Sequence, residues 1–254
     1  MTCTVANPVK LRKLFVLATV VFALTAVCGC RKRSGTNNSN STSSSIPSDP
    51  EEAKRQSQNL VAQGRGLYDN DEITKASEVF KQAVANDPNN GEAHLRLGMA
   101  YAALGKDDEA DEEYKKSIEL FRKTTQDDGK DGKAHFYLGE AHSFLHQDES
   151  AVKAYRQATR LMPDDEEAWY QLGKAETRLA NYSEATSAFQ KALELKPDDY
   201  RATDGLDNAK EGTQRIREGK KHNEEMLKKQ QENTNANGNS NSGSSPKPAP
   251  KRTP

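Results

Sequence analysis

The chain has 254 residues, of which 33% are hydrophobic and 30% are charged, and its formal net charge at pH 7 is −1. A net charge so close to zero, with lysine and arginine dispersed along the chain, excludes a nucleic-acid-binding protein of the usual basic kind. The hydrophobic fraction is low for one globular domain, so polar segments are expected to flank a smaller folded part.

A basic stretch and an apolar run begin the chain. The basic residues lie within 10–13, and the apolar run 14–27 has the length of a signal-peptide core but is short for a membrane-spanning helix. The run ends in Val-Cys-Gly-Cys at 27–30, which resembles a bacterial lipobox. In that motif a small residue precedes a cysteine that becomes lipid-modified and N-terminal. Cys30 fits this role best, and Cys28 is the alternative.

We therefore expect residues 1–29 to be a lipoprotein-type signal peptide and residues 30–50 to be a lipid-anchored, flexible tether rich in Ser, Asn and Thr. The alternative is an uncleaved signal anchor. Either interpretation attaches the rest of the chain to a membrane of the bacterial cell envelope. All three cysteines lie within residues 1–30, so the folded part is expected to have no disulfide and no thiolate metal site.

A 34-residue pattern then occurs four times. The units are 57–90, 91–124, 132–165 and 166–199, and each has glycine at its position eight, alanine at twenty, an aromatic residue at twenty-four and a small residue at twenty-seven. Three of the four have proline at position thirty-two, and a polar loop, 125–131, separates the second unit from the third. This period is typical of a solenoid, in which each unit buries its apolar face only against its neighbours.

Each unit reads as a helical hairpin. In the fourth unit the spacing predicts a helix over 166–180 and a second over 184–195, with Ser183 as its N-cap and Pro197 ending the unit. Glycine inside a helix costs about 1 kcal/mol relative to alanine. Its recurrence at position eight, as at Gly173, predicts a close approach by a neighbouring helix.

These residues resemble the pattern of the tetratricopeptide repeat (TPR) family. The fourth unit matches that pattern at Trp169, Leu172, Gly173, Ala185, Phe189, Ala192 and Pro197. The resemblance implies an all-α fold, a right-handed α-solenoid of four TPR hairpins whose first helices line a concave groove. It also implies that a protein or peptide partner binds in this groove.

The resemblance assigns groove side chains to positions two, five, nine, twelve and thirteen of each unit. The residues so placed that we expect to contact a partner are Val61, Arg65, Tyr68, Leu95, Met99, Phe136, Glu140, Tyr170, Lys174 and Arg178. Apolar anchors among charges of both signs suit an extended or helical peptide. For Leu95 and Phe144, packing between repeats is an equal alternative.

The segment after the last unit continues a helical pattern. Within the expected folded part, 51–231, residues 200–231 are predicted to be a capping and projecting helix in which Tyr200, Leu206 and Ala209 cover the open end of the array. Residues 232–254 are predicted to be a disordered, basic, proline-containing tail. Its role is either to aid solubility or to contact an anionic surface.

Catalytic and metal-binding motifs are missing from the sequence, which has no phosphate-binding loop, nucleophile elbow or metalloprotease motif. His142 and His146 have the spacing of metal ligands on a helix, but they fall at a packing position and at the turn of their unit. His94 and His135 both occupy position four, which Trp169 fills in the last unit. We therefore expect packing histidines, no metal, no cofactor and no enzyme activity.

The function that follows is that of a membrane-tethered TPR adaptor. It would bind partners through its concave groove and help to assemble or localise a bacterial envelope complex. The alternative is a client-binding or regulatory subunit of an envelope protease or transporter. The oligomeric state and the identity of the partner stay open.

Overall fold

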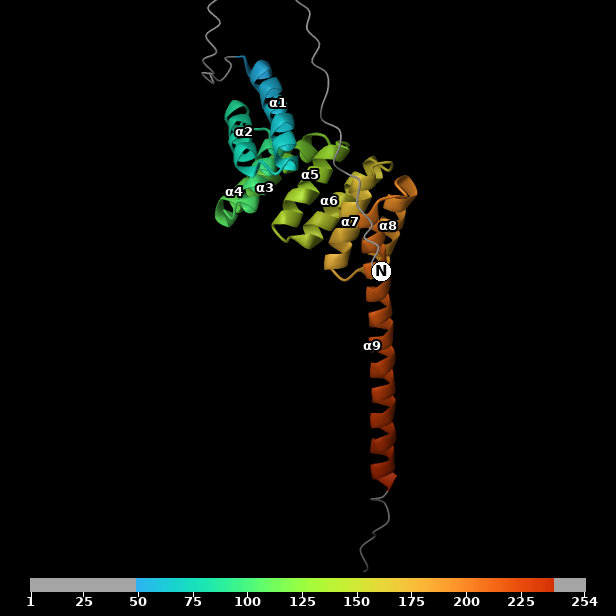
Figure 1. Ribbon diagram of the computed structural model, residues 1–254. Helices are drawn as coiled ribbons and strands as arrows, with labels where there is room; N and C mark the ends of the chain where they lie inside the picture. The colour runs from blue at the N-terminus through green and yellow to red at the C-terminus, as the bar shows by residue number, and fades with distance from the viewer. Residues whose placement is uncertain (1–48, 240–254) are drawn as a thin grey trace, which may run out of the picture. The chain divides into compact units, whose positions relative to one another are not determined.

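The structure, a computed structural model, describes residues 49–239. All regular secondary structure in this part is α-helix, which confirms the all-α prediction (Figure 1). The helices are α1 (Pro50–Asp69), α2 (Ile73–Asn86), α3 (Gly91–Ala103), α4 (Asp107–Asp127), α5 (Gly132–Phe144), α6 (Asp148–Leu161), α7 (Glu166–Arg178), α8 (Tyr182–Leu195) and α9 (Tyr200–Asn239).

The helices pack as four consecutive hairpins, α1–α2, α3–α4, α5–α6 and α7–α8, and each hairpin also packs against the next. The odd-numbered helices contact one another in series, α1 with α3, α3 with α5, α5 with α7 and α7 with α9. Among the described helices the even-numbered ones make no such contacts with one another. The odd-numbered helices therefore form the inner, more tightly curved face of the solenoid.

The packing that recurs in each hairpin explains the glycine at position eight. A Cβ atom on Gly173 would lie 2.7 Å from the ring of Phe189, which α8 presses against α7. The other three units repeat this arrangement, and in each the ring would lie 2.7 Å or less from the added Cβ. The pairs are Gly64 with Phe80, Gly98 with Tyr114, and Gly139 with Tyr155. The predicted close approach is confirmed, and the aromatic ring at position twenty-four makes it.

The first helices of the units have side-chain caps, whereas the second helices do not. Asn90, Asp131 and Asp165 each accept a hydrogen bond from the backbone N–H three residues ahead, at 2.9–3.1 Å. Helix α8 begins at Tyr182, and its N-cap residue Asn181 makes no side-chain capping bond. The expectation that Ser183 caps this helix is therefore wrong.

Helix α4 is longer than the second helices of the other units. Arg122 stands where the other units have proline, and without that proline the helix continues to Asp127. Only residues 128–131 of the loop expected at 125–131 lie outside a helix. Helix α1 likewise begins seven residues before its repeat unit, at Pro50, with Asp49 as its cap.

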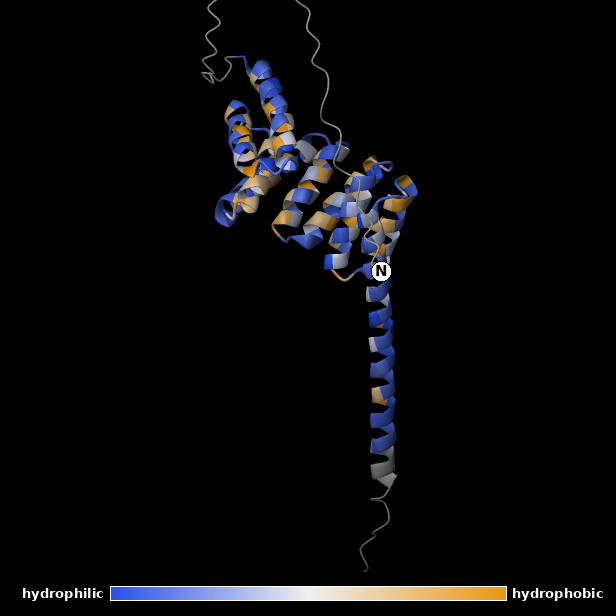
Figure 2. Cartoon of the chain, viewed as in Figure 1, coloured by the Kyte–Doolittle hydropathy of each residue, from blue (hydrophilic) through white to orange (hydrophobic). Residues whose placement is uncertain are grey.

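The core lies between the helices of each pair and between successive pairs. It is built mainly from alanines and the aromatic rings of the second helices, and Figure 2 shows hydrophobic residues gathered on the facing sides of the helices. Helix α9 packs on α7 and α8 and buries Ala209, with Leu206 partly buried beside it. Tyr200 is 74% exposed and does not cover the end of the array as expected.

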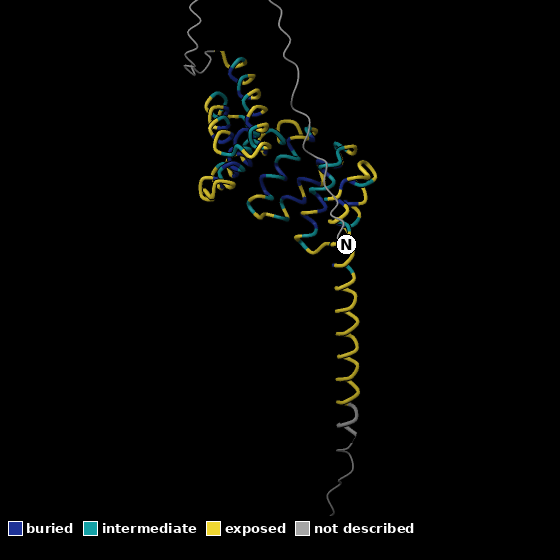
Figure 3. Tube along the Cα trace, viewed as in Figure 1, coloured by how far each residue is buried: buried dark blue, intermediate teal, exposed yellow. Residues whose placement is uncertain are grey.

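Beyond the array, α9 is open to solvent. Every residue from Gln214 to Thr234 is exposed (Figure 3), and the helix runs to Asn239, eight residues past its expected end. The start of the predicted disordered tail, 232–239, is therefore helical, and residues 240–254 lie outside the described part. No helix among residues 49–239 is long and apolar enough to cross a bilayer. The predicted leader and both candidate lipidation sites, Cys28 and Cys30, also lie outside the described part.

Candidate partner-binding groove

The inner face presents side chains from four successive odd-numbered helices. Of the ten residues expected to line the groove, eight are at least partly exposed, and they come from α1, α3, α5 and α7. These are Arg65, Tyr68, Met99, Phe136, Glu140, Tyr170, Lys174 and Arg178. Their common face results from the repeat, because the same positions of each first helix point the same way.

Two of the expected groove residues belong to the core instead. Val61 is 4% exposed and packs with Ala83 and Ala93 between the first and second units. Leu95 is fully buried and packs against Tyr114 and its neighbours in α4 and α5. Position five is thus a packing position in the first two units. The expectation of a groove contact is wrong for Val61, whereas for Leu95 the alternative of packing between repeats holds.

Position five opens toward the groove in the third and fourth units, where it carries an aromatic ring. Phe136 is partly buried and lies 5.9 Å from Tyr155 and 5.7 Å from Tyr137, measured between ring centroids. The ring centroid of Tyr170 lies 5.9 Å from that of Phe189. Each ring therefore rests on the aromatic core of its own hairpin with one side open.

Phe144, whose role the sequence leaves open, is both packed and exposed. Its ring stacks on Tyr114 at 4.9 Å between centroids, with an angle of 6° between the planes, yet the residue is 39% exposed. It extends the apolar surface at the end of α5.

A line of alternating charges crosses the middle of the groove. Arg65 of α1 lies 3.7 Å from Glu92, which lies 3.6 Å from Arg96 of the same helix, and Arg96 lies 3.7 Å from Glu140 of α5. These separations exceed hydrogen-bonding distance, so buried oxygens of both glutamates are without a hydrogen-bond donor in this part of the structure. Burial raises the pKa of Glu140, and Arg96 opposes that effect.

An open cavity of about 400 Å³ lies over this line of charges. It is lined by Arg65, Arg96, Lys133, Phe136, Tyr137, Glu140, Met162, Asp165 and Glu167. The lining alternates aromatic rings with charges of both signs, which suits a polypeptide better than a small apolar ligand. Burial, together with the charge of Glu92, raises the pKa of Tyr137 to about 12, so its hydroxyl stays a hydrogen-bond donor.

The sequence did not identify Arg96 and Tyr137 as groove residues. Both stand at position six of their units, which lies outside the set that the family resemblance assigns to the groove. The sequence feature that could have indicated their role is that position six carries a cation in the second unit and an aromatic ring in the third. The two side chains meet at 5.7 Å from the guanidinium carbon to the ring centroid, a cation–π contact.

A second open cavity, of about 420 Å³, lies between α7 and α9. In its lining, the ring of Tyr170 contacts two cations, Lys174 at 5.4 Å and Arg201 at 4.5 Å from the ring centroid. Arg178 at its rim donates to Asp148 and to Ser143, both at 2.5 Å. Burial, aided by the positive charge of Arg178, lowers the pKa of Lys174.

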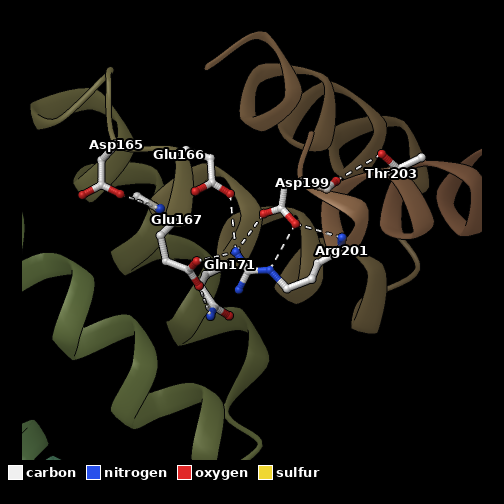
Figure 4. A network of polar contacts seen from close by, with 8 residues as sticks. Asp165, Glu166, Glu167, Gln171, Asp199, Arg201 and Thr203 are labelled. Carbon is white, nitrogen blue, oxygen red and sulfur yellow. Dashed lines mark hydrogen bonds and ion pairs between the residues drawn. The ribbon is translucent and has the colours of Figure 1, made fainter. Parts of the chain in front are cut away.

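Arg201 is a further groove residue that the sequence did not identify. It pairs with Glu167 of α7 at 2.9 Å and with Glu166 of α7 at 3.5 Å, which holds the start of α9 to α7 (Figure 4). It also pairs with Asp199, which directly precedes α9, at 2.8 Å. Its hydrogen bond holds the pKa of Asp199 well below the usual range, whereas burial and the bond to Asp199 raise the pKa of Glu166 to about 7. The sequence predicts α9 only as a capping and projecting helix, without a part in the groove.

The histidines serve the packing of the repeats. At position four, His94 Nε2 lies 3.1 Å from the carbonyl oxygen of Pro88, and Trp169 donates to the carbonyl of Pro163 at 2.9 Å. His142 is buried and pairs with Gln147 at 2.6 Å, while His146 lies in the turn between helices. Residues 49–239 contain no group of three or more side chains arranged to hold a metal ion.

Comparison with protein families gives matches to one repeat type. Tetratricopeptide repeat models match residues 90–164 and 166–199, and a further TPR repeat model matches residues 64–105. Together these matches cover more than half of the chain. A comparison with curated protein sequences gives no match.

Solved structures with a similar chain path include the following three. A MamA protein is 24% identical, with 76% of this chain and 98% of that chain covered and a TM-score of 0.45. PilF of Pseudomonas aeruginosa is 19% identical, with 66% and 72% covered and a TM-score of 0.49. YrrB, described as a TPR protein with an unusual peptide-binding site, is 21% identical, with 64% and 89% covered and a TM-score of 0.40.

The matched residues cover the second, third and fourth hairpins and the first hairpin from residue 64 onward, and they include the glycine–aromatic packing described above. Proteins built from this repeat are in general non-enzymatic scaffolds for protein–protein interaction. The chain belongs to the tetratricopeptide repeat family.

Proposed function

We propose that this protein is a membrane-tethered adaptor that holds a protein partner in its inner groove and thereby assembles or localises a complex of the bacterial envelope. The observation that carries this proposal is the composition of the inner face. Open aromatic rings, Phe136 and Tyr170, alternate there with charged side chains across four successive helices. Such a surface offers apolar anchors and hydrogen-bonding partners to a polypeptide. Its polar side chains do not converge on one point, as those of a catalytic site do.

The tether in this proposal rests on the sequence of the leader. A basic stretch, a short apolar run and a cysteine after a small residue support lipid anchoring at Cys30. A diacylated cysteine holds a protein at a bilayer more firmly than one acyl chain does.

Two charge-reversal variants test the groove. Lys174→Glu changes the inner face at α7, and Lys191→Glu makes the same change on the exposed side of α8. Both full-length proteins, and the unchanged protein, are used to capture partners from detergent-solubilised envelopes. We expect a specific partner to be lost from the Lys174 variant and kept by the Lys191 variant. Equal capture by both would contradict binding in the groove.

Metabolic labelling with a fatty acid tests the anchor independently. The label is expected on the unchanged protein and on a Cys28→Ser variant, and it should be missing from a Cys30→Ser variant. Loss only with Cys28→Ser would move the modification to that residue. Labelling of none of the three proteins would contradict a lipid anchor and favour an uncleaved signal anchor.

A further inference from the structure

Helix α9 carries a stripe without charges along its length. Fourteen of the residues 202–234 are charged, yet none of them lies at the ten positions that are reached from Ala202 by alternating steps of three and four residues. These ten positions are Ala202, Gly205, Ala209, Gly212, Ile216, Gly219, Asn223, Met226, Gln230 and Asn233. Spacings of three and four return to one side of a helix, so the ten residues form one continuous seam.

The first part of this seam is already a helix–helix interface. Ala202 and Ala209 are fully buried against α8, and a Cβ added to Gly205 would lie 2.6 Å from Phe189. At Gly212 the ring of Tyr182 would lie 2.5 Å from an added Cβ. The small residues of the seam thus let another helix approach closely.

The second part of the seam has no partner within the described part of the chain. From Gln214 to Thr234 every residue is exposed, and Figure 2 shows short hydrophobic interruptions on an otherwise hydrophilic helix. Ile216 is 42%, Met226 53% and Leu227 58% exposed. A polar helix of this length gains most of its stability from packing one face, so an uncovered seam is poised to accept a partner.

The charges beside the seam are of one sign. The positions that flank it on either side carry the charged residues Arg215, Lys220 and Lys229 and no acidic residue. The acidic residues lie away from the seam, and four of them recur every seven residues. These four are Glu211, Glu218, Glu225 and Glu232.

We propose that the exposed seam of α9, residues 216–233, is a docking site for an amphipathic helix of another protein whose own flanking positions are acidic. The seam continues a face that already packs a helix within the array. Acidic flanks on the partner would pair with Arg215, Lys220 and Lys229. This surface is separate from the inner groove, so the proposal does not depend on the groove.

Two other occupants fit less well. A second copy of the chain would bring basic flanks against basic flanks in either orientation, which opposes pairing. A lipid bilayer would have to accept the amides of Asn223 and Gln230 at the centre of the seam. An amide that lacks a hydrogen-bond partner is costly in hydrocarbon, whereas single polar residues are tolerated in the seam of a helix pair.

A synthetic helix of stated composition tests the proposal. The probe is a fluorescent 28-residue peptide with leucine at its seam positions and glutamate at its flanking positions, and a second peptide has lysine in place of those glutamates. Each is titrated with the full-length protein in mild detergent, and binding is followed by fluorescence anisotropy. We expect the glutamate peptide to bind and the lysine peptide to bind at least tenfold more weakly.

Two variants with the same loss of charge separate docking from general attraction. Lys220→Gln/Lys229→Gln removes charges beside the seam, and Lys221→Gln/Lys228→Gln removes charges from the opposite side of the same helix turns. The first variant should bind the glutamate peptide at least tenfold more weakly, and the second should stay within twofold of the unchanged protein. Circular dichroism confirms that both keep the helix.

Several results would overturn the proposal. Equal weakening of peptide binding by both variants would mean that the peptide is attracted by the charge of α9 and does not dock on the seam. Absence of peptide binding to the unchanged protein would mean that no such site exists. A concentration-dependent dimer that is lost on Ile216→Asn/Met226→Asn would assign the seam to a second copy. Binding to phosphatidylglycerol vesicles that this seam variant loses, without peptide binding, would assign it to lipid.

Discussion

The carboxylate of Glu176 on α7 is 1% exposed, and it is held by the guanidinium of Arg156 on the preceding hairpin. Arg156 donates to Glu176 Oε1 from Nε at 3.0 Å and from a terminal nitrogen at 2.5 Å, and Asn181 donates to Oε2 at 2.9 Å. The two residues join the third and fourth units across their interface. The buried charge is therefore compensated by Arg156 from the preceding hairpin and by Asn181 from the turn that follows α7.

Removing Arg156 should weaken this interface. Arg156→Ala leaves a buried carboxylate without its charged donor, and we expect it to lower the free energy of unfolding by about 1 to 3 kcal/mol. Urea denaturation followed by circular dichroism measures the change. Arg160→Ala removes an exposed arginine one turn later on α6, and it should change the stability by no more than about 0.5 kcal/mol. Equal effects of the two substitutions would contradict a role for the Glu176 contact.

Position fifteen of every unit has a left-handed backbone. Asp71, Gly105, His146 and Ala180 have φ angles of 62°, 71°, 55° and 58°, and each ends the turn between the two helices of its hairpin. Only one of the four is glycine, the residue that adopts this conformation without strain.

The pair Ala180→Gly and Gly105→Ala tests this strain with opposite changes. No atom lies within 4 Å of a Cβ added at Gly105, so the substitution there acts through the backbone alone. We expect Ala180→Gly to raise the free energy of unfolding by about 1 kcal/mol and Gly105→Ala to lower it by about the same amount. Shifts of the same sign, measured by urea denaturation, would refute the explanation.

Much of the fold could be read from the sequence because the repeat makes each feature appear four times. The position-four residues show this well. His94 and His135 were expected to fill the slot of Trp169, and all three place a ring nitrogen within 3.3 Å of the carbonyl oxygen six residues earlier. A shared position in the repeat thus predicted a shared structural role for chemically different side chains.

The groove residues were harder to predict than the fold. The family pattern states which repeat positions usually face the groove, but contacts with the neighbouring helix determine whether the side chain at such a position is exposed or buried. Val61 and Leu95 occupy the same repeat position as Phe136 and Tyr170, yet only the latter pair reaches the groove. Arg201 was missed for a different reason. Helix α9 packs on α7 and α8 as the first helix of a fifth repeat would, and Arg201 stands at position two of that incomplete repeat. This role of α9 could be recognised only from its contacts.

The glycine at position eight gives a test of the hairpin packing. Gly173→Ala places a methyl group 2.7 Å from the Phe189 ring, which must move within a packed core, and we expect a loss of about 1 to 3 kcal/mol. Gly66→Ala is the control, since no atom lies within 4 Å of its Cβ, and it should stabilise α1 by about 0.5 to 1 kcal/mol.

A double variant shows whether the ring causes the loss. Gly173→Ala/Phe189→Leu should cost less than the sum of its two single changes, because the smaller side chain leaves room for the added methyl group. Thermal and urea denaturation of the four proteins measure this coupling. Additive effects would mean that Gly173 matters for another reason.

The junction of α7 and α9 should make stability depend on pH through Glu166. Its pKa is raised to about 7 by burial and by its hydrogen bond to Asp199, compared with 4.5 for an ordinary glutamate. At a pH between about 4.5 and 7, Glu166 therefore holds a proton in the folded protein that it has released in the unfolded chain. The Glu166 contribution to stability is therefore greatest below about pH 4.5 and falls as the pH rises toward 7.

Glu166→Gln removes this titration while keeping the size and hydrogen-bonding capacity of the side chain. We expect the variant to gain stability relative to the unchanged protein as the pH rises from 5 to 8, by about 1 to 3 kcal/mol. Urea denaturation at both pH values gives the difference, and the same substitution at the exposed Glu149 is the matched control. A difference between variant and unchanged protein that stays constant from pH 5 to pH 8 would show that Glu166 is ionised in the folded protein throughout, and that the α7–α9 junction does not sense pH.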